Sequence, residues 1–393
     1  MCVYERGNIA SLSNLSSFQH FSNQGLVPHI TLLGSGGGQR AAVGLVGSLY
    51  QMEKEGLLDT LLYLGGVSGS TWSMSSLYSD PEWSTNLDRA VSRLSGPGVE
   101  MELALAWLDE RSKEEHFSRT DVWGVLTSAG IMKQMDLRRF SDEASRNASN
   151  PYPIYCAIEK HCFSNGPIEG THTLGLAVHT TSLLGSRFQG GKLLEQKPEM
   201  DMVQLQGVCS QADLFAIKVN QQFKISLFEG LTLCCWAEHS VPPCLQLKDR
   251  FHLFDAGLLI NVAYPSFLGD KRDIDLLIAP EYSAGNMFEV LDYAAAVNKP
   301  FPEIDEKILE ERDWPKDCYV FEGKDKEPTI VYMPLFNRNN CKGLGDVSGE
   351  KHQQLTTMTD FSTRQIFDQR KRKITGLSPV LILNRPTLCF HGH

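Results

Sequence analysis

The first group of residues that could do chemistry surrounds Ser68, in the stretch "GGVSGSTW" directly after the apolar run "LLYL". The small residues around this serine are Gly65, Gly66, Gly69 and Ser70. They fit a nucleophile elbow, a sharp strand-to-helix turn that exposes a serine Oγ, because a larger Cβ substituent would strike the strand or the helix. Ser70 replaces the last glycine of the G-x-S-x-G pattern, and a turn built only for packing is the alternative.

A second segment, "GSGGGQR" at 34–40, follows an earlier apolar stretch. Its glycines could turn backbone N–H groups toward one point at a helix N-terminus, as the stabilisation of an oxyanion requires. A nucleotide-binding loop is disfavoured, because Gln39-Arg40 stands where a P-loop needs Lys-Ser/Thr and no third glycine completes G-x-G-x-x-G. Arg40 could anchor a substrate phosphate through its planar guanidinium. A surface ion pair is an equally good interpretation of Arg40.

The third segment is "FHLFDAGLLIN", in which Asp255 follows an apolar run and precedes Ala256-Gly257. A carboxylate at such a strand end can act as a general base if it reaches Ser68. The alternative is an Asp that caps the next turn. The histidines after it, His352, His391 and His393, lie in no recognisable strand-end turn, and this favours a Ser-Asp dyad over a Ser-Asp-His triad.

The elements that must position these groups alternate along the chain. Strand "HITLL", a helix from Gln39 to Gly56, the apolar run 57–64 and helix "STWSMSSLY" form a βαβ pattern, which predicts a parallel sheet covered by helices. Further strands are expected at "YPIYCAIEK", "FHLFDAGLLI" and "DIDLLIAP", and helices within 80–150, as in "EMELALAWLDERSKEEH". The fold class is therefore α/β.

Composition restricts the classes of partner. Of the 393 residues 42% are hydrophobic, enough for a sizeable core, and the net charge of −10 argues against nucleic-acid binding and against adsorption to anionic lipid. No apolar run of 18 residues and no signal peptide is visible, so we expect no transmembrane segment. Ten scattered cysteines without CxxC indicate a cytosolic chain of reduced thiols. No Cys/His cluster suits a metal, and no cofactor is expected.

Taken together, these segments resemble the group IV cytosolic phospholipases A2, with the gamma-type member nearest. The resemblance rests on "LGSGGGQRA", "GLLDTLLYLGGVSGSTWSMSSLY", "PYPIYCAIEK", "LFDAGLLINVAYP" and "MPLFN". It implies a patatin-like three-layer α/β/α fold with a cap. It also implies that Ser68 is the nucleophile, that Asp255 activates it without a histidine, and that Arg40 holds the lipid phosphate. In the same resemblance Gly37 and Gly38 are the oxyanion donors.

The resemblance further implies a calcium-independent phospholipase A2 and lysophospholipase that contacts intracellular membranes peripherally from the cytoplasm, since no calcium-binding C2 module precedes the motifs. The interval before "FHLFDAGL" is short, so we expect a shortened cap. We divide the chain into an arm at 1–28, a catalytic domain at 29–373 and a divergent tail at 374–393. A lipid-binding or scaffold protein without turnover, and a Ser-Asp-His esterase, are the alternatives.

Overall fold

The computed structural model describes a large part of the chain, and all structural statements below concern that part. The described residues are 27–114, 117–139, 142, 149–159, 173–176, 187–189, 192–195, 198–208, 253–258, 260–268, 272–283, 288–296, 301–324 and 327–338. The predicted arm and the predicted tail lie largely or wholly outside these ranges, as does the interval 209–252 in which a shortened cap was expected. The division into three segments and the shortened cap therefore stay predictions.

The first part of the chain forms the strand–helix–strand–helix unit that its apolar pattern predicts. These elements are β1 (Ile30–Gly34), α2 (Gln39–Lys54), β2 (Leu61–Gly66) and α3 (Gly69–Leu77). Gly56 follows α2 with φ of 67°, as expected for a glycine that ends a helix. The run 57–64 is only partly strand, because Leu58–Thr60 form a 3-10 turn (η2) in which Thr60 Oγ1 donates to the Leu57 carbonyl at 2.7 Å.

The main sheet has the strand order β4-β3-β2-β1-β8-β10-β9, with β7 also paired to β3. Its centre, β3-β2-β1-β8-β10, is parallel throughout, as the βαβ pattern predicts, and β4, β7 and β9 pair antiparallel. The remaining strands are β3 (Tyr152–Glu159), β4 (Thr173–Leu176), β7 (Leu253–Asp255), β8 (Leu276–Pro280), β9 (Tyr319–Phe321) and β10 (Thr329–Met333); β5 (Arg187–Gln189) and β6 (Lys192–Glu195) form a separate hairpin.

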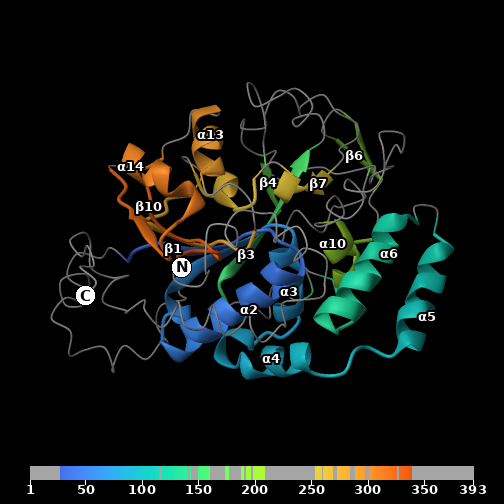
Figure 1. Cartoon of the computed structure of the whole chain (residues 1–393). Helices are drawn as coiled ribbons and strands as arrows, with labels where there is room; N and C mark the ends of the chain where they lie inside the picture. Colours follow the sequence, from blue (N-terminus) through green and yellow to red (C-terminus); the bar gives the residue numbers. More distant parts are fainter. Residues whose placement is uncertain are drawn as a thin grey trace.

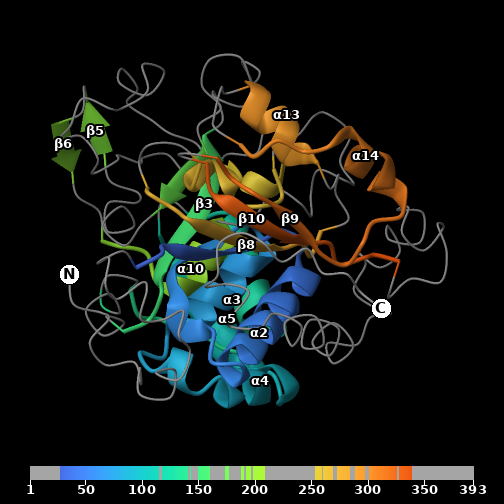
Figure 2. The ribbon, with the colours of Figure 1, turned by 90° about the vertical axis from the view of Figure 1, so that its left-hand side faces the viewer.

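Helices cover both faces of this sheet, which makes three layers (Figures 1 and 2). Leu32 and Leu33 are consecutive in β1 and point to opposite faces, so each belongs to a different buried cluster. The Leu32 cluster contains residues of α2, α3 and α10 (Met202–Val208). The Leu33 cluster contains residues of the short helices η6 (Ala256–Leu258) and η7 (Tyr264–Ser266), and of α13 (Glu289–Ala296). The predicted α/β fold with helices on both faces is confirmed.

The helices expected within 80–150 are present. They are η3 (Trp83–Thr85), α4 (Asp88–Ser95), α5 (Met101–Ser112), α6 (Arg119–Val125) and the π-helical η4 (Leu126–Met132). Two short helices, α14 (Glu306–Leu309) and η8 (Glu310–Asp313), precede β9. None of the helices in the described ranges is both long enough and apolar enough to cross a bilayer.

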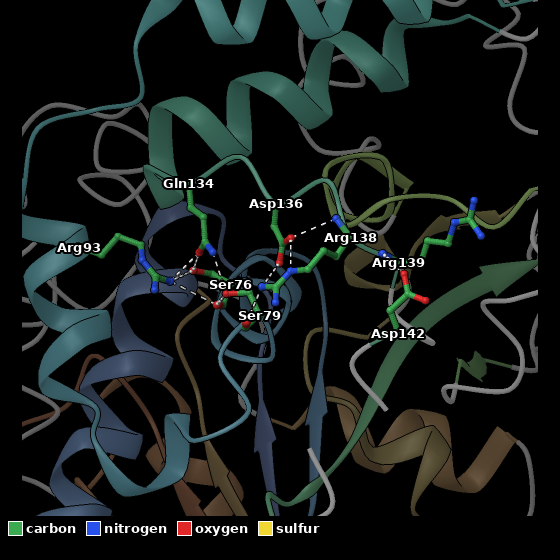
Figure 3. A network of polar contacts seen from close by, with 8 residues as sticks. All are labelled: Ser76, Ser79, Arg93, Gln134, Asp136, Arg138, Arg139 and Asp142. Atoms are coloured by element: carbon green, nitrogen blue, oxygen red, sulfur yellow. Dashed lines mark hydrogen bonds and ion pairs between the residues drawn. The ribbon is translucent and has the colours of Figure 1, made fainter. Parts of the chain in front are cut away.

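A polar network holds the C-terminal end of α3, the helix that follows Ser68 (Figure 3). Arg93 of α4 donates from Nη1 to Ser76 Oγ at 3.0 Å and to Gln134 Oε1 at 2.5 Å. Gln134 Nε2 in turn donates to Ser79 Oγ at 2.7 Å, and Arg138 donates to the Ser79 carbonyl. The network links α3 to α4 and to the segment after η4. It thereby fixes the end of α3 that lies farther from Ser68, the candidate nucleophile.

Candidate active site

Ser68 occupies a strained turn between β2 and α3. Its backbone has φ of 49° and ψ of −123°, and of the described non-glycine residues only Ser68 and Lys133 have a positive φ. A side chain in this region of φ/ψ space costs free energy, so such a residue persists only where the surrounding structure holds it. The hydrogen bonds from Ser70 N to the Val67 carbonyl (3.1 Å) and from Thr71 N to the Ser68 carbonyl (2.8 Å) do so. This is the predicted elbow geometry.

The small residues of the elbow have two different close neighbours. A Cβ at Gly66 would collide with Sδ of Met74 in α3, as the prediction of a clash with the helix requires. A Cβ at Gly69 would instead meet the backbone of Gly38, at 2.6 Å from its carbonyl carbon and 2.9 Å from its Cα. Gly69 is therefore small because the glycine loop lies against it, which the sequence pattern alone did not indicate.

The glycine loop between β1 and α2 is tied to its surroundings at its first residues. Ser70 Oγ donates to the Ser35 carbonyl and Tyr282 N donates to Ser35 Oγ, both at 2.6 Å. Gly36 N donates to the Asn261 carbonyl at 2.6 Å. These bonds connect the loop to α3, to the residues after β8 and to the segment after Asp255.

Gly37 and Gly38, the predicted oxyanion donors, follow these anchored residues; Gly37 lies against the backbone of Tyr282 and Gly38 against Gly69. Their φ angles are 133° and 58°, values that favour glycine. Neither N–H group has a hydrogen-bond partner among the residues that the structure describes. Gly38 also precedes α2 directly, at the end of the helix where the dipole favours negative charge. The loop therefore presents two uncommitted donors close to the elbow.

Strand pairing brings Asp255 beside the elbow. β2 pairs with β3 as far as Gly66 opposite Tyr155, and β7 then pairs with β3 with Asp255 opposite Ala157. At Ala157 the other edge of β3 pairs with β4. β7 therefore pairs with the same edge of β3 as β2 and lies beyond the end of β2. Asp255 thus ends a strand at the place where the chain of β2 turns away toward Ser68.

The Asp255 carboxylate is buried with the rest of the side chain, at 0% exposure, and Ser68 is 1% exposed. Asp255 Oδ1 accepts a hydrogen bond from Gly257 N at 2.8 Å, so the carboxylate folds back over its own turn. This Asx-type bond is the turn-capping role considered above, and it leaves Oδ2 outside that interaction. Capping and general-base catalysis are therefore compatible in one residue.

Asn261 joins the three segments, and the sequence patterns gave it no role. Its Oδ1 lies 3.3 Å from the position of a Cβ at Gly36, and Ser68 Cβ lies 3.5 Å from that same position. The same Oδ1 lies 3.8 Å from the position of a Cβ at Gly257, where Asp255 Oδ1 is 3.1 Å away. The amide of Asn261 is thus placed between the elbow with its glycine loop on one side and the Asp255 turn on the other.

Arg40 is the second residue of α2, two positions after Gly38, and is buried, with 5% exposure, so it does not form the surface ion pair considered above. Its guanidinium carbon is 5.8 Å from the centre of the Phe336 ring. Within the described part of the chain, Nε and Nη1 have no hydrogen-bond partner. Desolvation lowers the pKa of Arg40, and the carboxylate of Glu281 opposes this shift. A buried cation with unsatisfied donors is suited to an anionic ligand.

Two further expectations concern residues of other types. His352, His391 and His393, the histidines weighed for a triad, lie outside the described residues. In the described ranges, no three His, Cys, Asp or Glu side chains are grouped so that they could hold a metal ion.

Comparisons with known proteins relate this site to one family. The model of the lysophospholipase catalytic domain matches residues 30–92, which contain the glycine loop and the elbow. Human cytosolic phospholipase A2 zeta is 28% identical over an alignment of 422 positions, which covers 80% of this chain and 49% of that protein. Human cytosolic phospholipase A2 gamma is 24% identical over 441 residues, which cover 80% of this chain and 81% of that protein. The chain therefore spans about half the length of the zeta-type relative.

The fold agrees with a solved member of the same group. The structure of human GIVD cytosolic phospholipase A2 superposes with a TM-score of 0.68 at 23% identity, over 93% of this chain and 62% of the other. This superposition confirms the predicted patatin-like α/β/α architecture. The resemblance carried by the sequence motifs is also confirmed, since the chain is similar in sequence and in fold to the cytosolic phospholipases A2. The expectation that the gamma-type member is nearest is not supported by identity, because the zeta-type relative is 28% identical and the gamma-type relative 24%.

Proposed function

We propose that the chain hydrolyses fatty acyl esters of glycerophospholipids, with phospholipase A2 and lysophospholipase activity, through Ser68 and Asp255. The observation that carries the proposal is the strained Ser68 elbow, which lies against a glycine loop with two N–H donors that have no partner among the described residues. Asp255, at the end of β7, which pairs with β3 on the same edge as β2, is the base predicted from the sequence. The relationship to the cytosolic phospholipases A2 supports the substrate class.

The mechanism has two halves. Ser68 Oγ attacks the acyl carbonyl carbon while its proton passes to the Asp255 carboxylate, and the N–H groups of Gly37 and Gly38 stabilise the oxyanion. The ester C–O bond then breaks, and the leaving lysophospholipid alkoxide takes the proton from Asp255. Water attacks the acyl-enzyme with Asp255 again as base, which releases the fatty acid and regenerates the Ser68 hydroxyl.

Arg40 is the residue that we assign to the substrate phosphate. Its unsatisfied Nε and Nη1 donors would gain an anionic partner when the phosphodiester binds, and the guanidinium geometry matches phosphate oxygens. No divalent cation takes part in this scheme, so the proposed reaction is calcium-independent. We further propose that the catalytic domain, 29–373, meets its substrate by peripheral contact with intracellular membranes from the cytoplasm.

The test uses the purified full chain, phosphatidylcholine in mixed micelles and a calcium chelator, with released fatty acid measured by mass spectrometry. Ser68→Ala should lower turnover by at least about 10³-fold while the protein stays folded. Ser75→Ala is the matched control, because Ser75 is a buried serine of α3, the helix that follows Ser68, and its Oγ donates only locally, to the Trp72 carbonyl at 2.9 Å. Full turnover in folded Ser68→Ala would remove Ser68 from the mechanism.

A fluorophosphonate probe supplies an independent readout. A relative of known structure was solved in complex with methyl gamma-linolenyl fluorophosphonate, which makes this reagent class a reasonable choice. The probe should label wild type and Ser75→Ala at Ser68 and should leave Ser68→Ala unlabelled. If folded wild type neither reacts with the probe nor releases fatty acid, the lipid-binding or scaffold alternative is favoured over the enzyme.

A further inference from the structure

We propose that Glu289 is a positioning residue for the Ser68 site and that it acts through Asn261. This inference rests on the proposed function and adds a residue that no motif in the sequence indicated. Glu289 is the first residue of α13, which packs on the face of the sheet opposite α2 and α3.

Both donor groups of Asn261 bind the same carboxyl. The Asn261 backbone N–H donates to Glu289 Oε1, and the Asn261 side-chain Nδ2 donates to Glu289 Oε2 at 3.0 Å. One carboxyl thus fixes the peptide plane and the side-chain rotamer of Asn261 at once. Paired hydrogen bonds to an acidic group define geometry more strictly than a single bond does.

The fixed groups of Asn261 are the ones that face the proposed reaction centre. Its backbone carbonyl accepts the hydrogen bond of Gly36 N at 2.6 Å, directly before the proposed oxyanion donors Gly37 and Gly38. Its Oδ1 points between the glycine loop and the Gly257 turn that holds Asp255. A shift of Asn261 would therefore move the loop relative to the elbow and open the gap toward Asp255.

The surroundings of Glu289 explain why this carboxyl is sensitive to its partners. Desolvation and the neighbouring Glu281 raise its pKa to about 8, and the two hydrogen bonds from Asn261 and one from the backbone N–H of Val262 oppose that rise. Glu281 itself interacts electrostatically with Arg40 and Tyr264. The carboxyl is thus held at an energetic cost beside the site, which a residue needed only for packing would not require.

The test is a double-mutant cycle on turnover of phosphatidylcholine in mixed micelles, with Glu289→Ala, Asn261→Ala and the double variant. Misplacement of catalytic groups by about 1 Å can cost on the order of 10²-fold, so each single variant should lower kcat by roughly 10- to 100-fold with KM nearly unchanged. If Glu289 acts through Asn261, the double variant should lose no more than the more damaging single variant. Glu289→Gln, which keeps one acceptor for Asn261, should retain most of the wild-type kcat.

The matched control is Asp201→Asn. Asp201 is also a desolvated carboxyl with a raised pKa, and it accepts hydrogen bonds from Gln204 N and Trp107 Nε1, both at 2.9 Å, and from the backbone N–H of Val203. Asp201 contacts α10 and α5 rather than the glycine loop, so Asp201→Asn should keep wild-type kcat per folded molecule. Thermal unfolding reports whether the variant is folded, and the rate of fluorophosphonate labelling should equal that of wild type.

The two proposals fail in different ways. The positioning role would be overturned if the losses in kcat of the two single variants multiplied in the double variant. It would also be overturned if the single variants changed only KM, or if Asp201→Asn lowered kcat equally. Wild-type kcat in Glu289→Ala while Ser68→Ala is inactive would overturn it as well, and that result would leave the proposed function intact. Turnover that survives in Ser68→Ala would overturn the proposed function and the positioning role together.

Discussion

Gly69→Ala is the substitution whose effect follows most directly from the geometry of the site. A Cβ at Gly69 would lie 2.6 Å from the carbonyl carbon of Gly38 and 2.9 Å from its Cα, both backbone atoms that cannot rotate away. Carbon atoms pack at about 3.5–4.0 Å, so the glycine loop and the elbow must separate by about 1 Å to admit the methyl group. A displacement of about 1 Å in a catalytic constellation can reduce the rate by about 10²-fold.

We therefore expect Gly69→Ala to lower kcat on phosphatidylcholine by about 10²-fold and to slow fluorophosphonate labelling of Ser68 similarly, because both reactions use the same oxyanion donors. Gly56→Ala is the control: its φ is 67°, nothing lies within 4 Å of its Cβ position, and it ends α2 far along the chain from the loop. It should cost about 1–2 kcal/mol of stability and leave kcat unchanged. A folded Gly69→Ala protein with wild-type kcat would refute the close apposition of loop and elbow.

Three more predictions address single groups. Asp255→Asn should reduce turnover by at least about 10³-fold and His352→Ala should not; inactivity of a folded His352→Ala protein would replace the dyad by a triad. Arg40→Gln should raise KM for a phospholipid more than for an uncharged acyl ester, and equal effects on both substrates would contradict a phosphate-binding role. The pKa of Glu289 is raised from 4.5 to about 8, so the folded state favours the protonated carboxyl. Its contribution to the free energy of unfolding is complete below about pH 4.5 and is lost as pH rises through 8. Glu289→Gln should remove that loss, which amounts to at most roughly 4–5 kcal/mol. Denaturant unfolding at pH 5, 7 and 9 should then show a free energy of unfolding that depends less on pH than in wild type, and parallel pH curves for the two proteins would contradict this prediction.

Local patterns were sufficient for the first half of the site. The βαβ order, the glycine loop and the elbow were predicted because they depend on apolar periodicity and on the small size of neighbouring residues, both of which are visible within a few dozen positions. Two expected strands are shorter than their apolar runs. Leu58–Thr60 form a 3-10 turn in which side-chain hydrogen bonding to a nearby carbonyl competes with strand pairing, and β7 ends at Asp255, before the 3-10 turn at Ala256–Leu258.

The sequence by itself thus determined which residues could supply a nucleophile, a general base and a set of backbone donors, and in which class of fold. Only the tertiary structure decided three further points. β7 pairs with β3 on the same edge as β2 and so brings Asp255 beside the elbow, Arg40 is buried with two donors that have no partner in the described part of the chain, and Glu289 binds Asn261. The physical reason is that strand register and the burial of a charge depend on contacts between distant segments, and the free energy of those contacts is set by the whole packed structure rather than by the residues on either side.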